Sequence, residues 1–406
     1  MSTDCLSGEH LYQDVITYTR LGEHRTGTPG DALTSQWVLN RLHDAGLKAE
    51  FQPYRFRQFF PERVSLSVAG HEVQAFPEWP PRFIGPEPIR APLTAWTPAG
   101  GHLKGRIALL KYPAERLDIP AFRSGLRSRL QAMADAGALA AVLITPSPSG
   151  EVLIPNQDED ADILPLPLLD VGSRDEPLLT SAAETGAVAT FLLDGRQSAQ
   201  AESRNVIAHW GPPGDVIVVS TPMSGWFTCG GERGPGVAVA LALAQWVAQR
   251  RPKTGYLFDF NSGHELNGAG ARRFLASGAP KPAQVRCWFH LGANIATFDW
   301  ERDTREYNRH ANPEKYRVTC SDGELLSILN TAFSTLPQVK PYVGIGIGEL
   351  VAFFEAGYRG FGFFGGRHYF FHNPGDRAHT TAPELLEPLA LAAISALEAI
   401  EALPGG

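Results

Sequence analysis

The sequence predicts an α/β protein with a three-layer αβα architecture and a mainly parallel sheet, plus a smaller inserted domain of mixed β and α structure. From residue 203 onward, apolar runs of strand length alternate with helical segments, which is typical of a parallel sheet covered on both faces. Between residues 62 and 200 the pattern changes to short β-like runs separated by proline-rich loops. We therefore assign residues 1–61 and 201–406 to a discontinuous main domain and 62–200 to the insert.

The expected elements follow from hydrophobic periodicity and from residues that end helices and strands. Two helices are expected near residues 11–21 and 31–45, with Asp31 as the N-cap of the second and Gly46 at its end. In the main domain we expect strands at 216–219, 256–260, 285–289 and 360–364, a buried helix at 237–249 and a closing amphipathic helix at 384–401. In the insert we expect strands at 64–68, 107–111, 141–145 and 188–193 and a helix at 122–136.

Composition excludes several classes of protein. The 406 residues are 43% hydrophobic and 19% charged, with a net charge of −7 and no basic stripe, so a nucleic-acid surface is not expected. No apolar run approaches the roughly 18 residues of a membrane-spanning helix, and the first residues lack the pattern of a signal peptide. The four cysteines are scattered without metal-binding spacing. We expect a soluble, cytoplasmic protein whose partner is a small-molecule substrate; a homo-oligomer is compatible with the sequence.

Histidines and carboxylates follow several of the expected strands. In sheets of this class, sites form in the loops beyond the carboxyl ends of the strands. The relevant loops are residues 220–224, 231–236, 261–265, 290–292 and 367–376. Mixed histidine and glutamate ligands suit Zn²⁺ best, with Fe²⁺ or Mn²⁺ as alternatives. The sequence therefore predicts one divalent metal ion, with zinc as the first choice.

Five segments, in the same order, resemble motifs of the M28 family of zinc aminopeptidases. They are residues 203–208 at the entry to the sheet, 234–238 after the bridging aspartate, 261–270 at S-G-E-E-x-G-x-x-G-S, 348–357 at S-D-x-x-x-F-x-x-x-G, and 371–376 at Y-H-T-x-x-D. A weaker match at 103–108 and 136–142 resembles the protease-associated (PA-like) domain found as an insert in this family. The resemblance implies a zinc-exopeptidase fold with a PA-like insert.

The chain departs from the family pattern at the metal site. The H-x-D motif of the first site reads Thr-Pro-Met-Ser at 221–224, and His290 stands near the other first-site aspartate. The resemblance places Glu232 at the bridging aspartate and His264 at the catalytic glutamate.

The second site of the family keeps ligands of the right type. The resemblance implies Glu232, Glu265 and His372 as the ligands of a single metal with an open position for water or substrate. For Glu232, an ion pair with its neighbour Arg233 is the competing interpretation.

Roles for the other polar residues follow from their positions. His264 is expected to be a general acid or base, or else a hydrogen-bond partner of a ligand carboxylate. His290 is expected to be catalytic as a donor to a developing oxyanion, with a fourth ligand or a structural histidine as alternatives. Glu349 resembles the position of an aspartate that orients groups of the active site, so we expect it to position a neighbour.

The substrate side of the site is expected to combine aromatic and cationic residues. Arg233 and Arg367 lie in the expected site loops and can bind a substrate carboxylate. Trp226 and Phe371 are the aromatic residues that we expect to contact an apolar part of the substrate.

Three functions remain open at this point. The first is a metal-dependent hydrolase that cleaves an amide-type bond in a small aromatic or carboxylated molecule. The second is a pseudo-peptidase that acts as a binding scaffold. The third is a cyclase or lyase related to the glutaminyl cyclases, which resemble this family and use one zinc.

Overall fold

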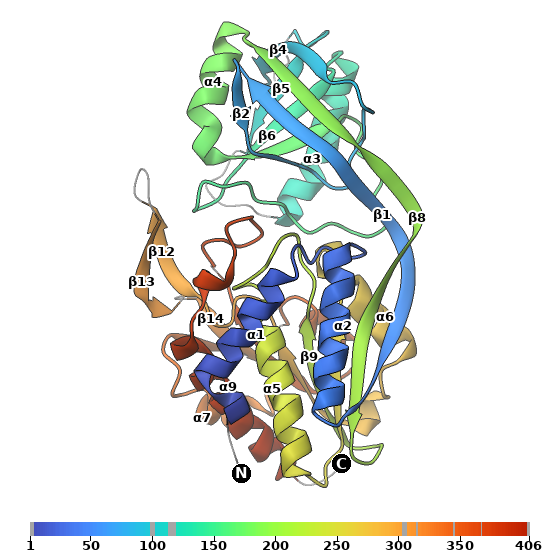
Figure 1. Ribbon diagram of the computed structural model, residues 1–406, viewed down its shortest axis with the longest axis vertical. Coiled ribbons are helices and arrows are strands. Elements are labelled where there is room, and N and C mark those ends of the chain that lie inside the picture. Colours follow the sequence, from blue (N-terminus) through green and yellow to red (C-terminus); the bar gives the residue numbers. More distant parts are fainter. Residues whose placement is uncertain are drawn as a thin grey trace. The chain divides into compact units, whose positions relative to one another are not determined.

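The computed structural model describes residues 4–97, 102–112, 119–302, 307–313, 316–343, 346–366 and 368–403. The chain forms two compact units: unit 1 comprises residues 1–55, 202–372 and 376–406, and unit 2 comprises residues 56–201 and 373–375. Two long strands, β1 (Lys48–Val68) and β8 (Val188–Trp210), contribute residues to both units (Figure 1). Within the described part of the chain, no helix is long and apolar enough to cross a membrane.

Unit 1 is built on a mixed, mostly parallel sheet. Besides part of β8, its strands are β9 (Val216–Pro222), β10 (Tyr256–Asn261), β11 (Val285–Leu291), β14 (Arg317–Ser321), β15 (Val339–Val343) and β16 (Gly360–Gly365). Their order is β15-β14-β16-β11-β9-β10-β8. The four central strands β16, β11, β9 and β10 are parallel, whereas β8 and β14 run antiparallel to their neighbours β10 and β16. The predicted fold class is therefore confirmed.

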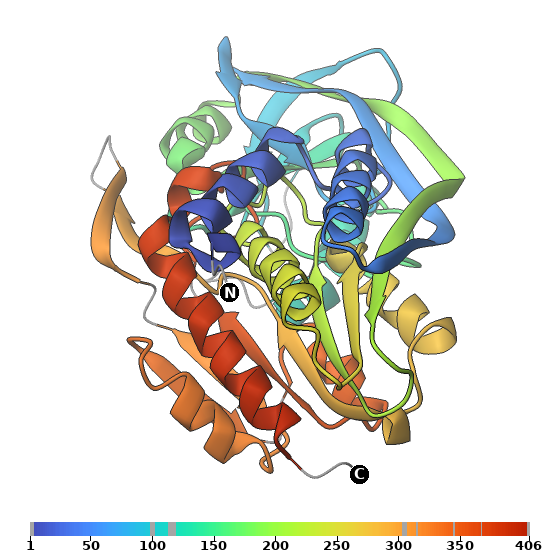
Figure 2. The same ribbon diagram turned by 60° about the horizontal axis from the view of Figure 1, so that its bottom comes forward.

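Helices cover both faces of this sheet. On one face lie α1 (Gly8–Arg20), α2 (Pro29–Asp44), α5 (Gly234–Arg250), α7 (Leu326–Ala332) and α9 (Pro383–Glu401), which share one hydrophobic core (Figure 2). The other face packs against α6 (Ala269–Ser277) and α8 (Leu350–Glu355) in a second core. Alternate residues of β9 point to opposite faces, because Ile217 and Val219 lie in the first core and Val216 and Val218 in the second.

Unit 2 contains the remaining strands of the 14-stranded sheet, which continues from β8 through β4. Its elements are β2 (His71–Val73), β3 (Ala75–Pro77), β4 (Ile89–Ala95), β5 (Ile107–Lys111), α3 (Ile119–Asp135), β6 (Ala140–Thr145), β7 (Leu168–Gly172) and α4 (Glu176–Thr185). Strands β4, β5, β6 and β7 are parallel neighbours, flanked by antiparallel β8 and β3. A further pair, β12 (Phe298–Arg302) and β13 (Tyr307–Pro313), forms an antiparallel ribbon in unit 1.

Two local expectations need correction. Helix α2 begins at Pro29, and its N-cap is Thr28, whose hydroxyl accepts from the N–H of Asp31; Asp31 itself is not the cap. The Asp31 carboxylate instead accepts hydrogen bonds from Ser203 and Ser262, both at 2.7 Å. The second correction concerns β1, which begins at Lys48 and is far longer than the short strand expected at 64–68.

Candidate metal site

Three loops of unit 1 bring Glu232, His264 and His372 together. Glu232 lies just before α5, His264 begins a short 3₁₀ turn after β10, and His372 follows β16. Unusual backbone conformations aim two of these side chains: Gly263 precedes His264 with a φ of 84°, and His372 itself has a φ of 55°. A non-glycine residue in this left-handed region costs on the order of 1–3 kcal/mol, and such strain clusters at functional sites.

Asp376 fixes the loop that carries Glu232. One of its oxygens accepts from the N–H of Gly231 at 2.7 Å, and the other accepts from the N–H of Glu232 at 2.9 Å. The position of the Glu232 backbone is therefore set by a buried carboxylate from the last part of the chain.

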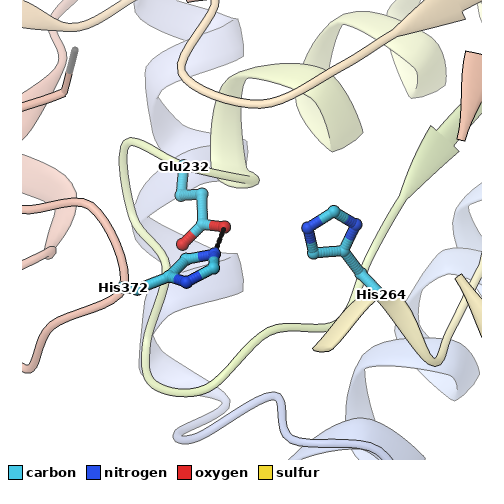
Figure 3. A group of neighbouring side chains, drawn as sticks. All are labelled: Glu232, His264 and His372. Carbon is cyan, nitrogen blue, oxygen red and sulfur yellow. Dashed lines mark ion pairs between the residues drawn. The ribbon is translucent and has the colours of Figure 1, made fainter. Parts of the chain in front are cut away.

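The three side chains form one compact group. Their potential ligand atoms all lie within 4.8 Å of one another, and no other such group of three is found among the residues that the structure describes. His372 Nε2 is 3.2 Å from Glu232 Oε1, and one ring nitrogen of His264 faces this pair (Figure 3). The side chains of Glu232 and His372 are 1% exposed and that of His264 is 12% exposed. The group is thus almost dry, with His264 as its most accessible member.

Arg233 forms a buried ion pair with Glu232. Its Nη2 lies 2.6 Å from Glu232 Oε1, and its Nε donates to the carbonyl oxygen of Ser224 at 3.2 Å. Burial alone would raise the pKa of Glu232, but the charge of Arg233 and the neighbouring His372 outweigh it and hold that pKa below its usual range. These neighbours therefore favour the ionised form of Glu232.

Glu265 does not belong to the group. One of its oxygens accepts from the backbone N–H of Thr26, and the other accepts from the hydroxyl of Ser224 at 2.9 Å. The same hydroxyl accepts from the N–H of His264 at 3.0 Å. Glu265 thus braces the loop that carries His264, and His264 takes the place in the group where the sequence led us to expect Glu265.

Glu349 lies between two histidines. Its Oε1 is 2.5 Å from His264 Nδ1, and its Oε2 is 3.6 Å from His290 Nε2. Burial opposes its ionisation, yet the two histidines lower the pKa of Glu349 well below its usual range. The carboxylate contacts the imidazole of His264 directly, so it can orient that ring.

His290 contacts Glu349, the carboxylate that also contacts His264. It is fully buried, its Nδ1 is 2.8 Å from the hydroxyl of Ser220, and burial lowers its pKa, which favours the neutral ring.

The donor set of the group fits a metal ion. Glu232 Oε2 is buried and has no hydrogen-bond partner among the described residues, so it is an available carboxylate ligand. One carboxylate and two imidazoles are ligands that Zn²⁺ accepts in sites with an open position. The carboxylate of Glu349 on the far nitrogen of His264 is the arrangement that commonly holds zinc-binding histidines.

The residues expected to contact substrate have different surroundings. Trp226 is 5% exposed, in the loop between β9 and α5. Phe371 stacks on His372, with ring centroids 3.7 Å apart. Arg233 is engaged by Glu232, although its Nη1 has no hydrogen-bond partner among the described residues. Arg367 lies outside the described residues.

Comparisons with known proteins bear on the fold. No protein-family model matches the sequence, and no curated protein matches it either. Among solved structures, 97% of the chain is similar to 95% of BSAP, a zinc aminopeptidase from Bacillus subtilis, with a TM-score of 0.73 and 16% identity. The chain has the zinc-exopeptidase fold.

Two further structures agree with this likeness. The whole chain is similar to 98% of a Peptidase M28 precursor from Shewanella amazonensis, with a TM-score of 0.73 and 15% identity. An aminopeptidase from an Aneurinibacillus species covers 97% of the chain with 94% of its own, at a TM-score of 0.64 and 18% identity. The likeness establishes the fold, and the chemistry of the site depends on this chain's own residues.

Sequence reasoning missed the residues that support the site. Thr26 and Ser224 donate hydrogen bonds to Glu265, and the Ser220 hydroxyl lies 2.8 Å from His290 Nδ1. Trp288 in turn donates to Ser220. Only Ser220 and Ser224 carried a signal, because both lie in the loop that follows a predicted strand.

Proposed function

We propose that this protein is a metal-dependent hydrolase that cleaves an amide-type bond in a small molecule, using one metal ion held by Glu232, His264 and His372. The observation that carries the proposal is the group itself: three ligand atoms within 4.8 Å of one another, with Glu232 Oε2 unpaired. Zinc is the ion that suits this donor set best, and it would polarise a carbonyl or activate a water.

The chain's own residues have distinct tasks in this proposal. Arg233 keeps Glu232 ionised, and Glu349 holds Nδ1 of His264 so that Nε2 faces the group. The unpaired Nη1 of buried Arg233 supports a substrate that carries a carboxylate, because a buried guanidinium N–H needs an acceptor.

Metal analysis of the purified protein tests the proposal. We expect about one zinc, iron or manganese per chain in the wild type, and loss of that metal in His372→Gln. His43→Gln is the matched control, because His43 is exposed on α2 and its Nε2 lies 2.9 Å from the backbone oxygen of Ala49. A wild type that holds no metal after reconstitution, or two ions per chain, would contradict the single-metal site.

His264→Gln separates the two roles open to that residue. If His264 is a ligand, the variant loses the metal as His372→Gln does. If it is a general base, the variant keeps the metal and loses turnover in a screen of small aromatic and carboxylated amides. Thermal melts of each variant exclude loss of fold as the cause.

The Glu232–Arg233 ion pair favours a second candidate function, a metal-free binding scaffold. A carboxylate that is already neutralised by a buried guanidinium competes less well for a cation. This candidate predicts no metal under any loading condition and no hydrolysis of any amide in the screen, with normal thermal stability.

A further inference from the structure

Thr26 contacts both residues that flank His264 in the sequence. It lies in the segment between α1 and α2 and is fully buried. Its Oγ1 accepts a hydrogen bond from the backbone N–H of Gly263 at 2.9 Å, and its own backbone N–H donates to Glu265 Oε1. The residue before His264 and the residue after it are therefore held by one residue, which lies 237 and 239 positions earlier in the chain.

The bond to Gly263 holds a backbone conformation that has no side chain to stabilise it. Gly263 has a φ of 84°, in the left-handed region that favours glycine. A Cβ at this position would lie 2.8 Å from the backbone nitrogen of Gly270, so no larger residue fits without a shift of the backbone. Because glycine is conformationally free, the orientation of its peptide group depends on an outside partner. The Thr26 hydroxyl is that partner, and it fixes the direction in which the chain enters His264.

The segment that carries Thr26 is anchored in turn. Asp31 is buried and accepts from the backbone N–H of Gly27, the residue after Thr26, at 2.8 Å. The hydroxyl of Ser262, the residue before Gly263, lies 2.7 Å from Asp31 Oδ1 and 3.3 Å from Thr26 Oγ1. Both ends of the contact are thus tied to the same buried carboxylate, so Thr26 is a fixed support for the loop after β10.

We propose that Thr26 is a positioning residue, which sets the backbone on both sides of His264 and so directs its imidazole toward the other two members of the group. Figure 3 shows the ring turned toward Glu232 and His372. The placement of the loop stands on hydrogen bonds to backbone groups and is independent of the protonation state of the site. Its consequence for zinc affinity rests on the proposed function.

Hydrogen exchange of the metal-free protein tests the placement directly. Thr26→Val has nearly the shape of threonine and keeps the backbone N–H to Glu265, but it removes the acceptor of the Gly263 N–H. The peptide that covers residues 261–266 should then exchange about 3- to 10-fold faster, the consequence of losing one hydrogen bond. Thr26→Ser keeps the hydroxyl and should exchange like the wild type.

Zinc titration of the same variants tests the consequence for the site. Thr26→Val should bind zinc about 10-fold more weakly, which is the lower end of the cost of losing an outer support of a metal ligand. Thr26→Ser should restore the affinity, and thermal melts verify that each variant is folded.

Thr145→Val is the matched control. Thr145 on β6 of unit 2 is also fully buried, and its Oγ1 likewise accepts a backbone N–H, from Leu153, at 3.0 Å. This variant loses an equivalent hydrogen bond and should lower the melting temperature, yet leave exchange at 261–266 and zinc affinity unchanged. Only a positioning role at the site predicts that the two threonines differ in this way.

Four results would overturn the proposal. They are unchanged exchange at 261–266 in Thr26→Val, a Thr26→Ser variant that behaves like Thr26→Val, an equal loss of zinc affinity in Thr145→Val, and a Gly263 amide that exchanges freely in the wild type. The last needs no variant, because an amide held by a buried acceptor should be strongly protected. If the wild type binds no zinc but Thr26→Val exchanges faster at 261–266, the positioning of the loop is supported and only the hydrolase is refuted.

Discussion

Replacing Asp170 by asparagine should flatten the pH dependence of the stability of unit 2. Asp170 on β7 is fully buried, and neither of its oxygens has a hydrogen-bond donor among the described N–H and O–H groups. Its neighbour is another buried acid, Glu78, which already accepts from the N–H of Trp79 at 3.0 Å and from Gln157 at 2.8 Å. Burial, with the nearby Glu78, raises the pKa of Asp170 well above its usual range. The pair therefore holds a proton in the folded state at pH values where an exposed aspartate has lost it.

The sign and size of the effect follow from proton linkage. A raised folded-state pKa means that the folded protein binds more protons than the unfolded chain, so stability falls as pH rises above the ordinary aspartate pKa of about 3.9. One such group changes the free energy of unfolding by about 1.4 kcal/mol per pH unit while it stays protonated in the fold. The wild type should therefore lose stability as pH rises from about 5, at up to this rate, until Asp170 ionises in the fold. An asparagine has no proton to lose, so Asp170→Asn should remove this slope.

Hydrogen exchange read by mass spectrometry measures how the stability of unit 2 depends on pH. Peptides that contain β7 and β3 report the free energy of opening of unit 2, after correction for the pH dependence of intrinsic exchange. Asp194→Asn is the control, since Asp194 lies in the same unit and its carboxylate is paired with Arg63 at 2.6 Å near the surface. Equal slopes in the wild type and Asp170→Asn, or a stability that rises from pH 5 to 7, would refute the reasoning.

Three further perturbations have defined outcomes. Thr28→Ala removes the cap of α2 and should cost about 1 kcal/mol in urea denaturation, and a loss under about 0.2 kcal/mol would argue against the cap. Asp376→Asn removes one of the acceptors that hold the Glu232 loop and should cost about 1–3 kcal/mol and reduce the metal content, while normal values of both would contradict the bracing role. Zinc at about 100 times its dissociation constant should stabilise the protein by about 2.7 kcal/mol in a thermal melt, and no shift would count against a folded-state site.

The sequence predicted the centre of the fold well because the relevant information is local. A helix as apolar as α5 can only be buried, and short apolar runs such as that of β9 mark central parallel strands. The elements without such a signal were missed or predicted too short. Helices α7 and α8 have seven and six residues, too few for a periodic pattern, and β1 alternates charged with apolar residues along a half-exposed strand.

The site was harder to predict for a physical reason. Whether a carboxylate binds a metal depends on what else its oxygens contact, and those contacts come from segments far away in the sequence. Glu265 is held by Thr26, 239 positions earlier in the chain, and by Ser224 on another loop. No local sequence pattern around residue 265 indicates either partner.

The orientation of His264 also depends on residues far away in the sequence. With its N–H fixed by the Ser224 hydroxyl and its Nδ1 by Glu349, the imidazole is directed at Glu232 and His372 by partners 40 and 85 positions away. With an acid at position 264, the group would contain two carboxylates and one imidazole. With His264 it contains one carboxylate and two imidazoles. Because Arg233 already pairs with Glu232, a second carboxylate in the group would favour cation binding through charge, whereas a histidine favours it through ligand type. If the group holds a metal ion as proposed, replacement of His264 should therefore change the preferred ion, because it exchanges one ligand type for another.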